Sequence, residues 1–193
     1  MKRFLFIILS IITFDCYSQS AGEYKTDELG IGLITFKNIE FLPDSLIFYK
    51  DKELKTPHQL VYSSTPDKKV HPKFYKPEEK ICYFVCVEST INYYKIIVNK
   101  SDQYYIVNNA GILFKSWDNL LTKSNGIIRT DKLNLFRSEP MEMGGIVNLS
   151  NKEERYKGVL VKDEWLKVKN EQKQTVAWLK WKLKNHLLVE IVF

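Results

Sequence analysis

Residues 164–193 read EWLKVK-NEQKQT-VAWLKW-KLKN-HLLVEIVF, and this stretch decides the fold. Its apolar residues fall into three short runs, and polar residues that favour turns separate the runs. Apolar and polar side chains alternate within each run, which is the period of a half-buried β-strand. Three of the four tryptophans lie here, and aromatic residues suit the pleated surface of a sheet. The stretch therefore predicts three consecutive strands.

Alternation also predicts which side chains of these strands are buried. The predicted core set is Leu166, Val168, Ala177, Leu179, Trp181, Leu187, Val189, Ile191 and Phe193. The opposite face carries two tryptophans among lysines, and these are the candidate ligand-binding residues: Trp165, Trp178, Lys167, Lys169 and Lys180. Paired strands place side chains about 5 Å apart, so the two indoles are predicted to form a shelf with a basic rim. The alternative is that residues 141–145 or the first part of the chain cover both indoles, because tryptophan is highly buried on average.

The rest of the chain continues the β pattern. Hydrophobic residues make up 45% and aromatic residues 13% of the sequence, and no segment of ten or more residues keeps a helical period. Residues 81–87 are continuously apolar and predict a buried central strand. Residues 108–111 read NNAG and predict a hairpin, while residues 116–121 predict one helical turn with Ser116 as its N-cap. We therefore expect a mostly β fold.

Residues 1–18 have the pattern of a signal peptide. Lys2 and Arg3 precede an apolar run over residues 4–14, and cleavage is expected after Ser18. The run is short for a membrane span, so the mature chain is expected to contain none. An uncleaved anchor is one alternative and a lipid on Cys16 is another, although the charged Asp15 disfavours the lipid. The sequence thus predicts export to the periplasm or the cell surface.

The mature chain divides into two regions at a polar break. Lys123-Ser-Asn-Gly126 is the predicted linker, exposed between β domains at residues 30–123 and 127–193. A weak internal repeat connects them, since SLIFYK at 45–50, YKIIVN at 94–99 and FKSW at 114–117 are similar to KLNLFR at 132–137, WLKVKN at 165–170 and WLKW at 178–181. Chance similarity between two β-rich stretches is the alternative. Residues 63–79, with three prolines, predict a long surface loop.

The residues that support chemistry are sparse, so we expect no enzyme activity, cofactor or metal. No nucleophile elbow, zinc-protease motif or phosphate loop is present. Cys82 and Cys86 are about 13 Å apart on a strand, too far for a disulfide, and are expected to be free buried thiols. The net charge is +6 with 25 lysines and four arginines. Scattered lysines with so few arginines do not indicate a nucleic-acid partner.

Three motifs follow one another in the second region: LNLFRSEP at 133–140, WLKV at 165–168 and AWL at 177–179. In these motifs the region resembles a bacterial SH3-like (SH3b) domain. The family usually has glycine where Ala177 stands, and the match covers residues 127–193. The resemblance implies two small SH3-like β-barrels in tandem after the signal peptide, used for binding cell-wall peptides or for positioning a catalytic domain.

The leading functional hypothesis is therefore an exported, non-enzymatic binding module. Its partner would be a cell-envelope peptide, glycan or protein, held by a concave aromatic groove. The second hypothesis is a structural or inhibitory interaction protein, such as an immunity factor or an assembly subunit, which would need a flat, exposed apolar patch. An enzyme is the third, and it would require Cys82 or Cys86 within hydrogen-bond reach of a histidine.

Overall fold

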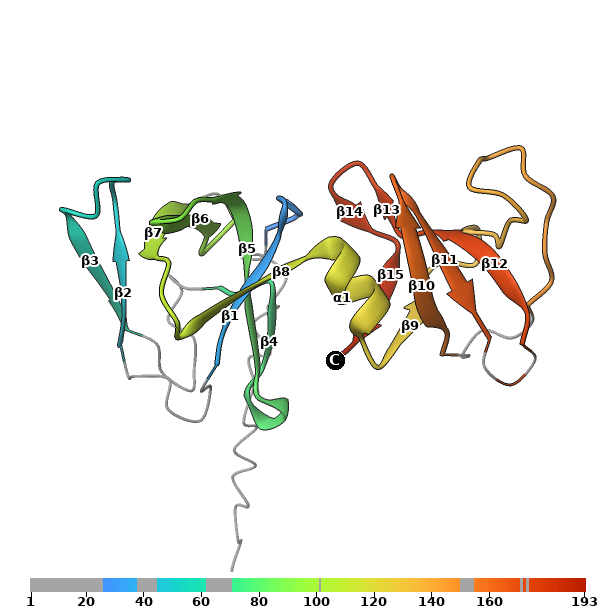
Figure 1. Ribbon diagram of the computed structural model, residues 1–193, viewed down its shortest axis with the longest axis horizontal. Helices are drawn as coiled ribbons and strands as arrows, with labels where there is room; N and C mark the ends of the chain where they lie inside the picture. The colour runs from blue at the N-terminus through green and yellow to red at the C-terminus, as the bar shows by residue number, and fades with distance from the viewer. Residues whose placement is uncertain are drawn as a thin grey trace, which may run out of the picture.

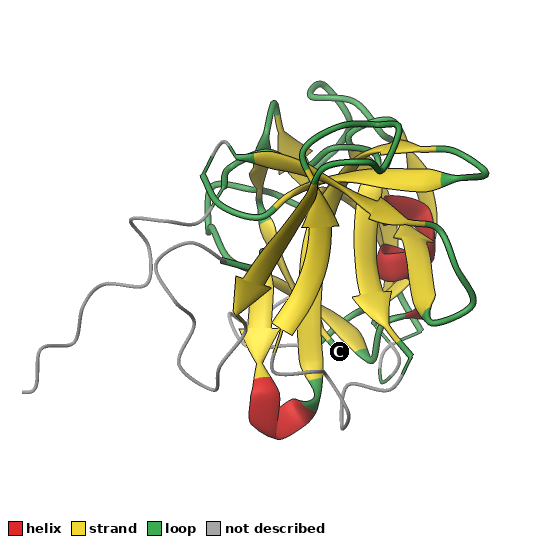
Figure 2. Ribbon diagram, turned by 90° about the vertical axis from the view of Figure 1, so that its left-hand side faces the viewer, coloured by secondary structure: helices red, strands yellow, loops and turns green. Residues whose placement is uncertain are grey.

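The structure is a computed structural model that describes residues 26–37, 45–61, 71–100, 102–149, 155–170, 172 and 174–193. The described part is mostly β with one α-helix (Figure 2). The expected signal peptide, Cys16 and residues 63–70 of the expected loop at 63–79 lie outside the described residues. The described end of that loop is not irregular throughout, because Phe74–Lys76 is a strand and Pro77–Glu79 a 3-10 helix. Figure 1 shows two lobes with the helix between them, and we call residues 26–116 the first half and 126–193 the second half. The helices that the structure describes include none long and apolar enough to cross a membrane.

The first half is one antiparallel sheet of eight strands. The strand order is β3-β2-β7-β6-β5-β1-β8, and β4 pairs with β5 beside this path. Residues 108–111 connect β7 to β8, but β8 pairs with β1, so the hairpin predicted there is wrong. The strands are β1 (Gly32–Phe36), β2 (Ser45–Tyr49), β3 (Pro57–Val61), β4 (Phe74–Lys76), β5 (Ile81–Ser89), β6 (Tyr93–Ile97), β7 (Gln103–Val107) and β8 (Ile112–Ser116).

The second half contains shorter ladders. β10, β11 and β12 form an antiparallel meander, β15 pairs with β9, and β13 pairs with β14. An isolated bridge between Ile127 and Tyr156 joins β9 to the start of β10, and another between Arg137 and Trp178 lies at the edge of β12. The strands are β9 (Gly126–Arg129), β10 (Lys157–Lys162), β11 (Trp165–Lys169), β12 (Val176–Lys180), β13 (Lys182–Leu183), β14 (His186–Leu187) and β15 (Val189–Val192).

The two halves repeat one strand order. In chain order, the first strand of each half pairs with its last strand, β1 with β8 and β9 with β15. Each first strand also meets the first strand of a three-stranded meander, β5-β6-β7 or β10-β11-β12. The third strand of each meander then pairs with a segment that leads into an earlier hairpin. In the first half β7 pairs with Tyr49 of β2, and in the second half β12 forms a bridge with Arg137. The described pairings close neither half into a barrel.

A bulge in each half fixes which residues correspond. The register shifts between Cys86 and Glu88 in the first half and between Gly158 and Leu160 in the second. When the two bulges are superposed, Lys95 corresponds to Lys167. The sequence repeat instead aligns Lys95 with Leu166, so it is displaced by one residue. The alignment of FKSW with WLKW is wrong, because FKSW runs from β8 into the helix that follows it and WLKW runs along β12 to the residue after it, and β8 and β12 are not equivalent strands. The repeat is therefore one of topology, with the sequence motifs displaced.

Two apolar clusters form the core, and β5 contributes to both. Cys82, Phe84 and Cys86 face the cluster inside the first half. Ile81, Tyr83 and Val85 face a cluster that also contains the core of the second half. The prediction of a buried central strand is confirmed, and Cys82 and Cys86 are buried and not joined by a disulfide. The predicted core set of the second half is also confirmed in this shared cluster, with Leu187 and Phe193 partly buried at its margin.

The helix α1 (Trp117–Lys123) connects the halves, and of the linker predicted to be exposed at 123–126 only Lys123 and Asn125 are exposed. Ser116 caps the helix by accepting a hydrogen bond from the Asn119 amide, as predicted. Trp117, Leu120 and Leu121 are buried in the shared cluster. Ser124 and Gly126, within the expected linker, are buried as well. The polar composition of this segment did not reveal that the helix packs against β10.

Candidate functional site

The five candidate residues lie on one face of β11 and β12. The register places Trp165 opposite Lys180 and Lys167 opposite Trp178, while Lys169 faces Val176. The prediction that these residues share one face is therefore correct, but the two tryptophans are diagonal neighbours. Each indole lies under the lysine across from it, with Lys180 Nζ 5.6 Å from the Trp165 ring centroid and Lys167 Nζ 5.9 Å from that of Trp178.

The predicted open shelf of two indoles is absent because Trp165 is covered. Its exposed fraction is 6%, whereas Trp178 is half-buried. Lys180 lies over the Trp165 ring and forms ion pairs with Glu142 and, at 3.3 Å, with Glu164. Glu142 belongs to residues 141–145, one of the two segments named as the alternative cover. The alternative is thus right for Trp165, and Trp178 remains accessible at one side.

The ion pairs fix the protonation states around Trp165. The hydrogen bond from Lys180 lowers the pKa of Glu142 below its usual range. The pKa of Lys180 is raised, first by the hydrogen bond to Glu142 and then by the hydrogen bond to Glu164. Both shifts favour the charged forms of Glu142 and Lys180. Lys180 is therefore a cation already paired with two carboxylates.

A pocket of about 250 Å³ opens beside the covered indole. Leucines supply its apolar walls and charged side chains its rim. Asn134 donates a 2.7 Å hydrogen bond to the Lys180 carbonyl, which holds the 131–137 segment against β12. Of the five candidate residues, Trp165 and Lys180 line the pocket, and Trp178, Lys167 and Lys169 do not. The lining comprises Asp131, Leu133, Asn134, Leu135, Arg137, Glu142, Trp165, Lys180, Leu183 and Leu188.

Arg137 is the cation best placed to receive a ligand at this pocket. Its backbone exchanges two 2.8 Å hydrogen bonds with Trp178, which fixes the residue at the edge of β12. Its Nη1 donates to the Gly144 carbonyl at 3.1 Å. A guanidinium has five N–H donors, so donors remain for a carbonyl or carboxylate. Sequence reasoning used Arg137 only within a family motif and did not identify it as a binding residue.

The side chains around this pocket offer apolar contact and charge pairing. The lining contains no Ser, Thr, Cys or His side chain, and the described residues hold no group of three or more metal-ligating side chains. Burial raises the pKa of the Cys86 thiol to about 12, so the thiolate needed for nucleophilic attack is scarcely formed at neutral pH. The Cys86 thiol donates instead to the Glu88 carbonyl at 3.2 Å.

Comparisons with known proteins identify no relative for this chain. No protein-family model matches it, no curated protein is similar to it, and no solved structure matches it. The resemblance to bacterial SH3-like domains therefore stays a prediction that rests on the three sequence motifs.

Proposed function

We propose that the protein is an exported, non-enzymatic binding module that takes a peptide segment at the pocket beside Trp165. The observation that carries the proposal is the composition of that pocket, with leucine walls under a rim of Arg137, Lys180, Asp131 and Glu142. Binding sites combine apolar walls with a few placed polar groups in this way. The periplasmic or cell-surface location in the proposal rests on the signal pattern of residues 1–18.

The pocket size sets the scale of the ligand. Sites for drug-sized molecules usually measure roughly 300–1,000 Å³, so a volume of about 250 Å³ fits one apolar side chain. Such a side chain would contact Leu135, Leu188 and the edge of the Trp165 indole. The remaining Arg137 donors would then bind a neighbouring main-chain carbonyl or a carboxylate. A peptide with an apolar residue next to an acidic residue matches both features. Peptide binding also agrees with the function that the resemblance to SH3-like domains implies.

A second function, a structural or inhibitory interaction protein, is favoured by exposed apolar side chains near the pocket. Leu133 is 86% exposed, Met143 91% and Ile146 68%, and all three lie in residues 131–146, which also supply the rim residues Asp131, Arg137 and Glu142. A larger protein partner would cover these side chains as well as fill the pocket. Exposed apolar patches of this kind mark interaction sites.

A peptide array tests the leading proposal. Fluorescently labelled mature protein would be incubated with arrayed random peptides, and selected peptides would be titrated in solution. We expect selection for an apolar residue beside Asp or Glu. The Trp165→Phe variant should weaken binding by about tenfold, equivalent to 1.4 kcal/mol. Trp178→Phe is the matched control, because Trp178 lies on the same face but outside the pocket, and its affinity should stay within about twofold.

Two outcomes would change the assignment. Equal losses in the Trp165 and Trp178 variants would move the site out of the pocket and onto the open face of β11 and β12. Absence of any peptide selection, together with loss of an envelope protein partner in Leu133→Asp and Met143→Asp, would favour the interaction protein instead.

A further inference from the structure

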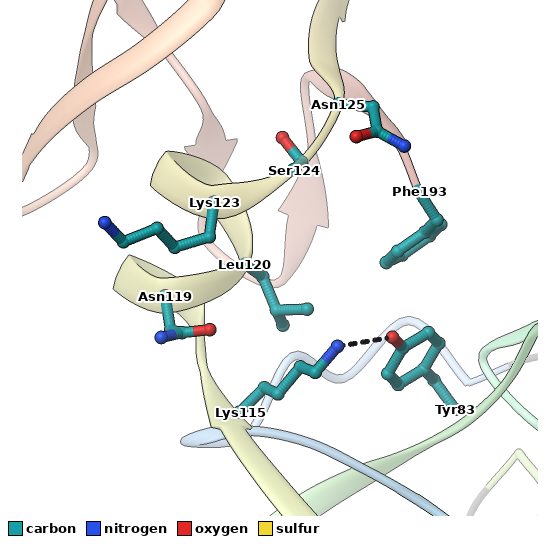
Figure 3. Close-up of a pocket in the computed structure, with 8 residues that line it drawn as sticks. All are labelled: Tyr83, Lys115, Asn119, Leu120, Lys123, Ser124, Asn125 and Phe193. Carbon is teal, nitrogen blue, oxygen red and sulfur yellow. Dashed lines mark hydrogen bonds between the residues drawn. The ribbon is translucent and has the colours of Figure 1, made fainter. Parts of the chain in front are cut away.

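A second hollow lies where the two halves meet, between α1, β5, β8 and the end of the chain (Figure 3). Its volume is about 220 Å³. The first half contributes Tyr83 and Lys115, and the second half contributes Phe193. The other lining residues belong to α1 and the turn that follows it: Asn119, Leu120, Lys123, Ser124 and Asn125.

The lining of this hollow is cationic without a matching acid. It includes two lysines and no aspartate or glutamate. Figure 3 shows Lys115 reaching toward the Tyr83 hydroxyl, while Lys123 extends away from the centre. Lys115 is half-buried, and no carboxylate among the described residues pairs with it. Burying an ammonium without a counter-ion is unfavourable, so the site favours an anion.

The Tyr83 hydroxyl supplies a second donor at the same place. It accepts a 2.9 Å hydrogen bond from Lys115 Nζ, which also lies 5.3 Å from the centroid of the Tyr83 ring. No described residue accepts the hydroxyl's own proton. An anion bound there would receive a charge-assisted bond from the ammonium and another from the phenol, and such bonds are stronger than neutral ones.

Apolar groups complete the hollow. The Phe193 ring stacks on Tyr83 with ring centroids 4.9 Å apart, and Leu120 is buried beside it. We propose that this junction is a binding site for a small carboxylate with a compact apolar body. The carboxylate lies on Lys115 Nζ and the Tyr83 hydroxyl, and the body packs against Leu120 and Phe193. This site is separate from the Trp165 pocket, and the proposal does not depend on peptide binding there.

The position of the site couples occupancy to the packing of the halves. Tyr83 and Phe193 come from different halves, so the complete site exists only while they are packed together. A ligand that binds the folded form alone raises the melting temperature with its concentration. Occupancy is therefore expected to hold the two halves together.

The test uses benzoate as the probe and the full mature protein. Amide NMR spectra are recorded during a benzoate titration, and melting temperatures are measured in parallel. We expect saturable shifts at Asn119, Ser124 and Asn125 and a higher melting temperature. Acetate lacks the ring and benzyl alcohol lacks the charge, so each should bind at least about tenfold more weakly than benzoate.

The matched variants are Lys115→Met and Lys95→Met. Both lysines are half-buried and lie over a tyrosine ring, but Lys95 is over Tyr105 and outside the hollow. Lys115→Met should weaken benzoate binding by about tenfold or more, and Lys95→Met should leave it unchanged. Tyr83→Phe should give a smaller loss.

Three results would overturn the proposal. One is the absence of saturable shifts at the junction amides in wild-type protein, a measurement that does not depend on any variant folding. Another is an equal response to benzoate, acetate and inorganic phosphate, which would indicate general anion screening. The third is an equal effect of the two lysine substitutions.

Discussion

The two halves of the molecule place the same kind of side-chain pair at the same point of the same strand order. In the first half Lys95 Nζ lies 5.7 Å from the Tyr105 ring centroid, and in the second Lys167 lies 5.9 Å from Trp178. Both pairs lie directly across the second and third strands of the meander. A lysine over an aromatic ring is favourable by about 0.5–1 kcal/mol at an exposed site. The shared scaffold therefore fixes this local contact.

The halves differ at the next pair of positions, which in the second half lines the pocket. Tyr93 faces Val107 in the first half, whereas Trp165 faces Lys180 in the second. Val107 carries no charge that could pair with another segment, and the Tyr93 hydroxyl donates a hydrogen bond to Glu88 at 2.8 Å. Lys180 instead joins the 141–145 segment to the sheet through Glu142. The lysine at this position thus holds one part of the pocket rim in the second half.

The largest effect is expected from truncating equivalent core residues. Leu179 in the second half corresponds to Ile106 in the first, and both are buried. Leu179→Ala and Ile106→Ala should each lower the free energy of unfolding by about 2–5 kcal/mol. Because one apolar cluster spans both halves, urea unfolding followed by fluorescence and circular dichroism should show a single transition. Two separate transitions would show that the halves fold independently, and a loss under about 1 kcal/mol at Leu179 would contradict its placement in the core.

A smaller loss of stability is expected from adding a methyl group at Gly158, which is equivalent to Cys86 in the first half. A Cβ on Gly158 would lie 2.0 Å from the Leu121 carbonyl oxygen of α1. Gly158→Ala should therefore cost about 1–3 kcal/mol by forcing the helix away from β10. Gly145→Ala is the control, since its nearest neighbour would be the Ser138 hydroxyl at 3.3 Å. Equal melting temperatures for the two variants would mean that α1 does not pack tightly on β10.

The burial of β5 in the first half predicts a low reactivity for the Cys86 thiol. With its pKa raised to about 12 by burial, the Cys86 thiol should be ionised in only about one molecule in ten thousand at pH 8. Iodoacetamide labelling of native protein, followed by mass spectrometry, should be slow and should accelerate with urea as the protein unfolds. Native labelling at the rate of a free cysteine would contradict the burial of this strand.

The smallest effect on stability is expected from making the second half resemble the first with Lys180→Val. The loss should stay below about 1 kcal/mol, because the partner carboxylates are largely exposed. Quenching of Trp165 fluorescence by acrylamide should nevertheless increase. The gain should be missing when the same substitution is made in Trp165→Phe, and its persistence there would mean that another tryptophan responds.

The pH dependence of this pair has a defined sign. The folded pKa of Glu142 is lowered by Lys180, so the pair stabilises the fold above the unfolded pKa of Glu142 and the contribution is lost as pH falls through the lowered folded value. Lys180→Val should remove this acid-side component from melting temperatures measured between neutral and acidic pH. An unchanged pH profile would show that the ion pair contributes nothing measurable.

The sequence alone determined the features that depend on local periodicity. Alternation assigned Leu166, Val168, Ala177 and Leu179 to the core and placed Trp165 and Trp178 on the opposite face, because side chains along a strand point to alternate sides. The apolar run at 81–87 gave a strand buried on both faces, and Ser116 gave the N-cap of α1. These outcomes follow from residues close to each other in the chain.

Only the tertiary structure decided which strands pair and in what register. The NNAG turn at 108–111 suits a hairpin, yet β8 pairs with β1 because that strand offers the complementary edge. The register sets each tryptophan opposite a lysine, and the contacts of Glu142 and Asn134 with Lys180 bring residues about forty positions away to the pocket. Strand pairing and packing join segments far apart in sequence, so a local pattern supplies the faces of each strand but not the neighbours that cover them.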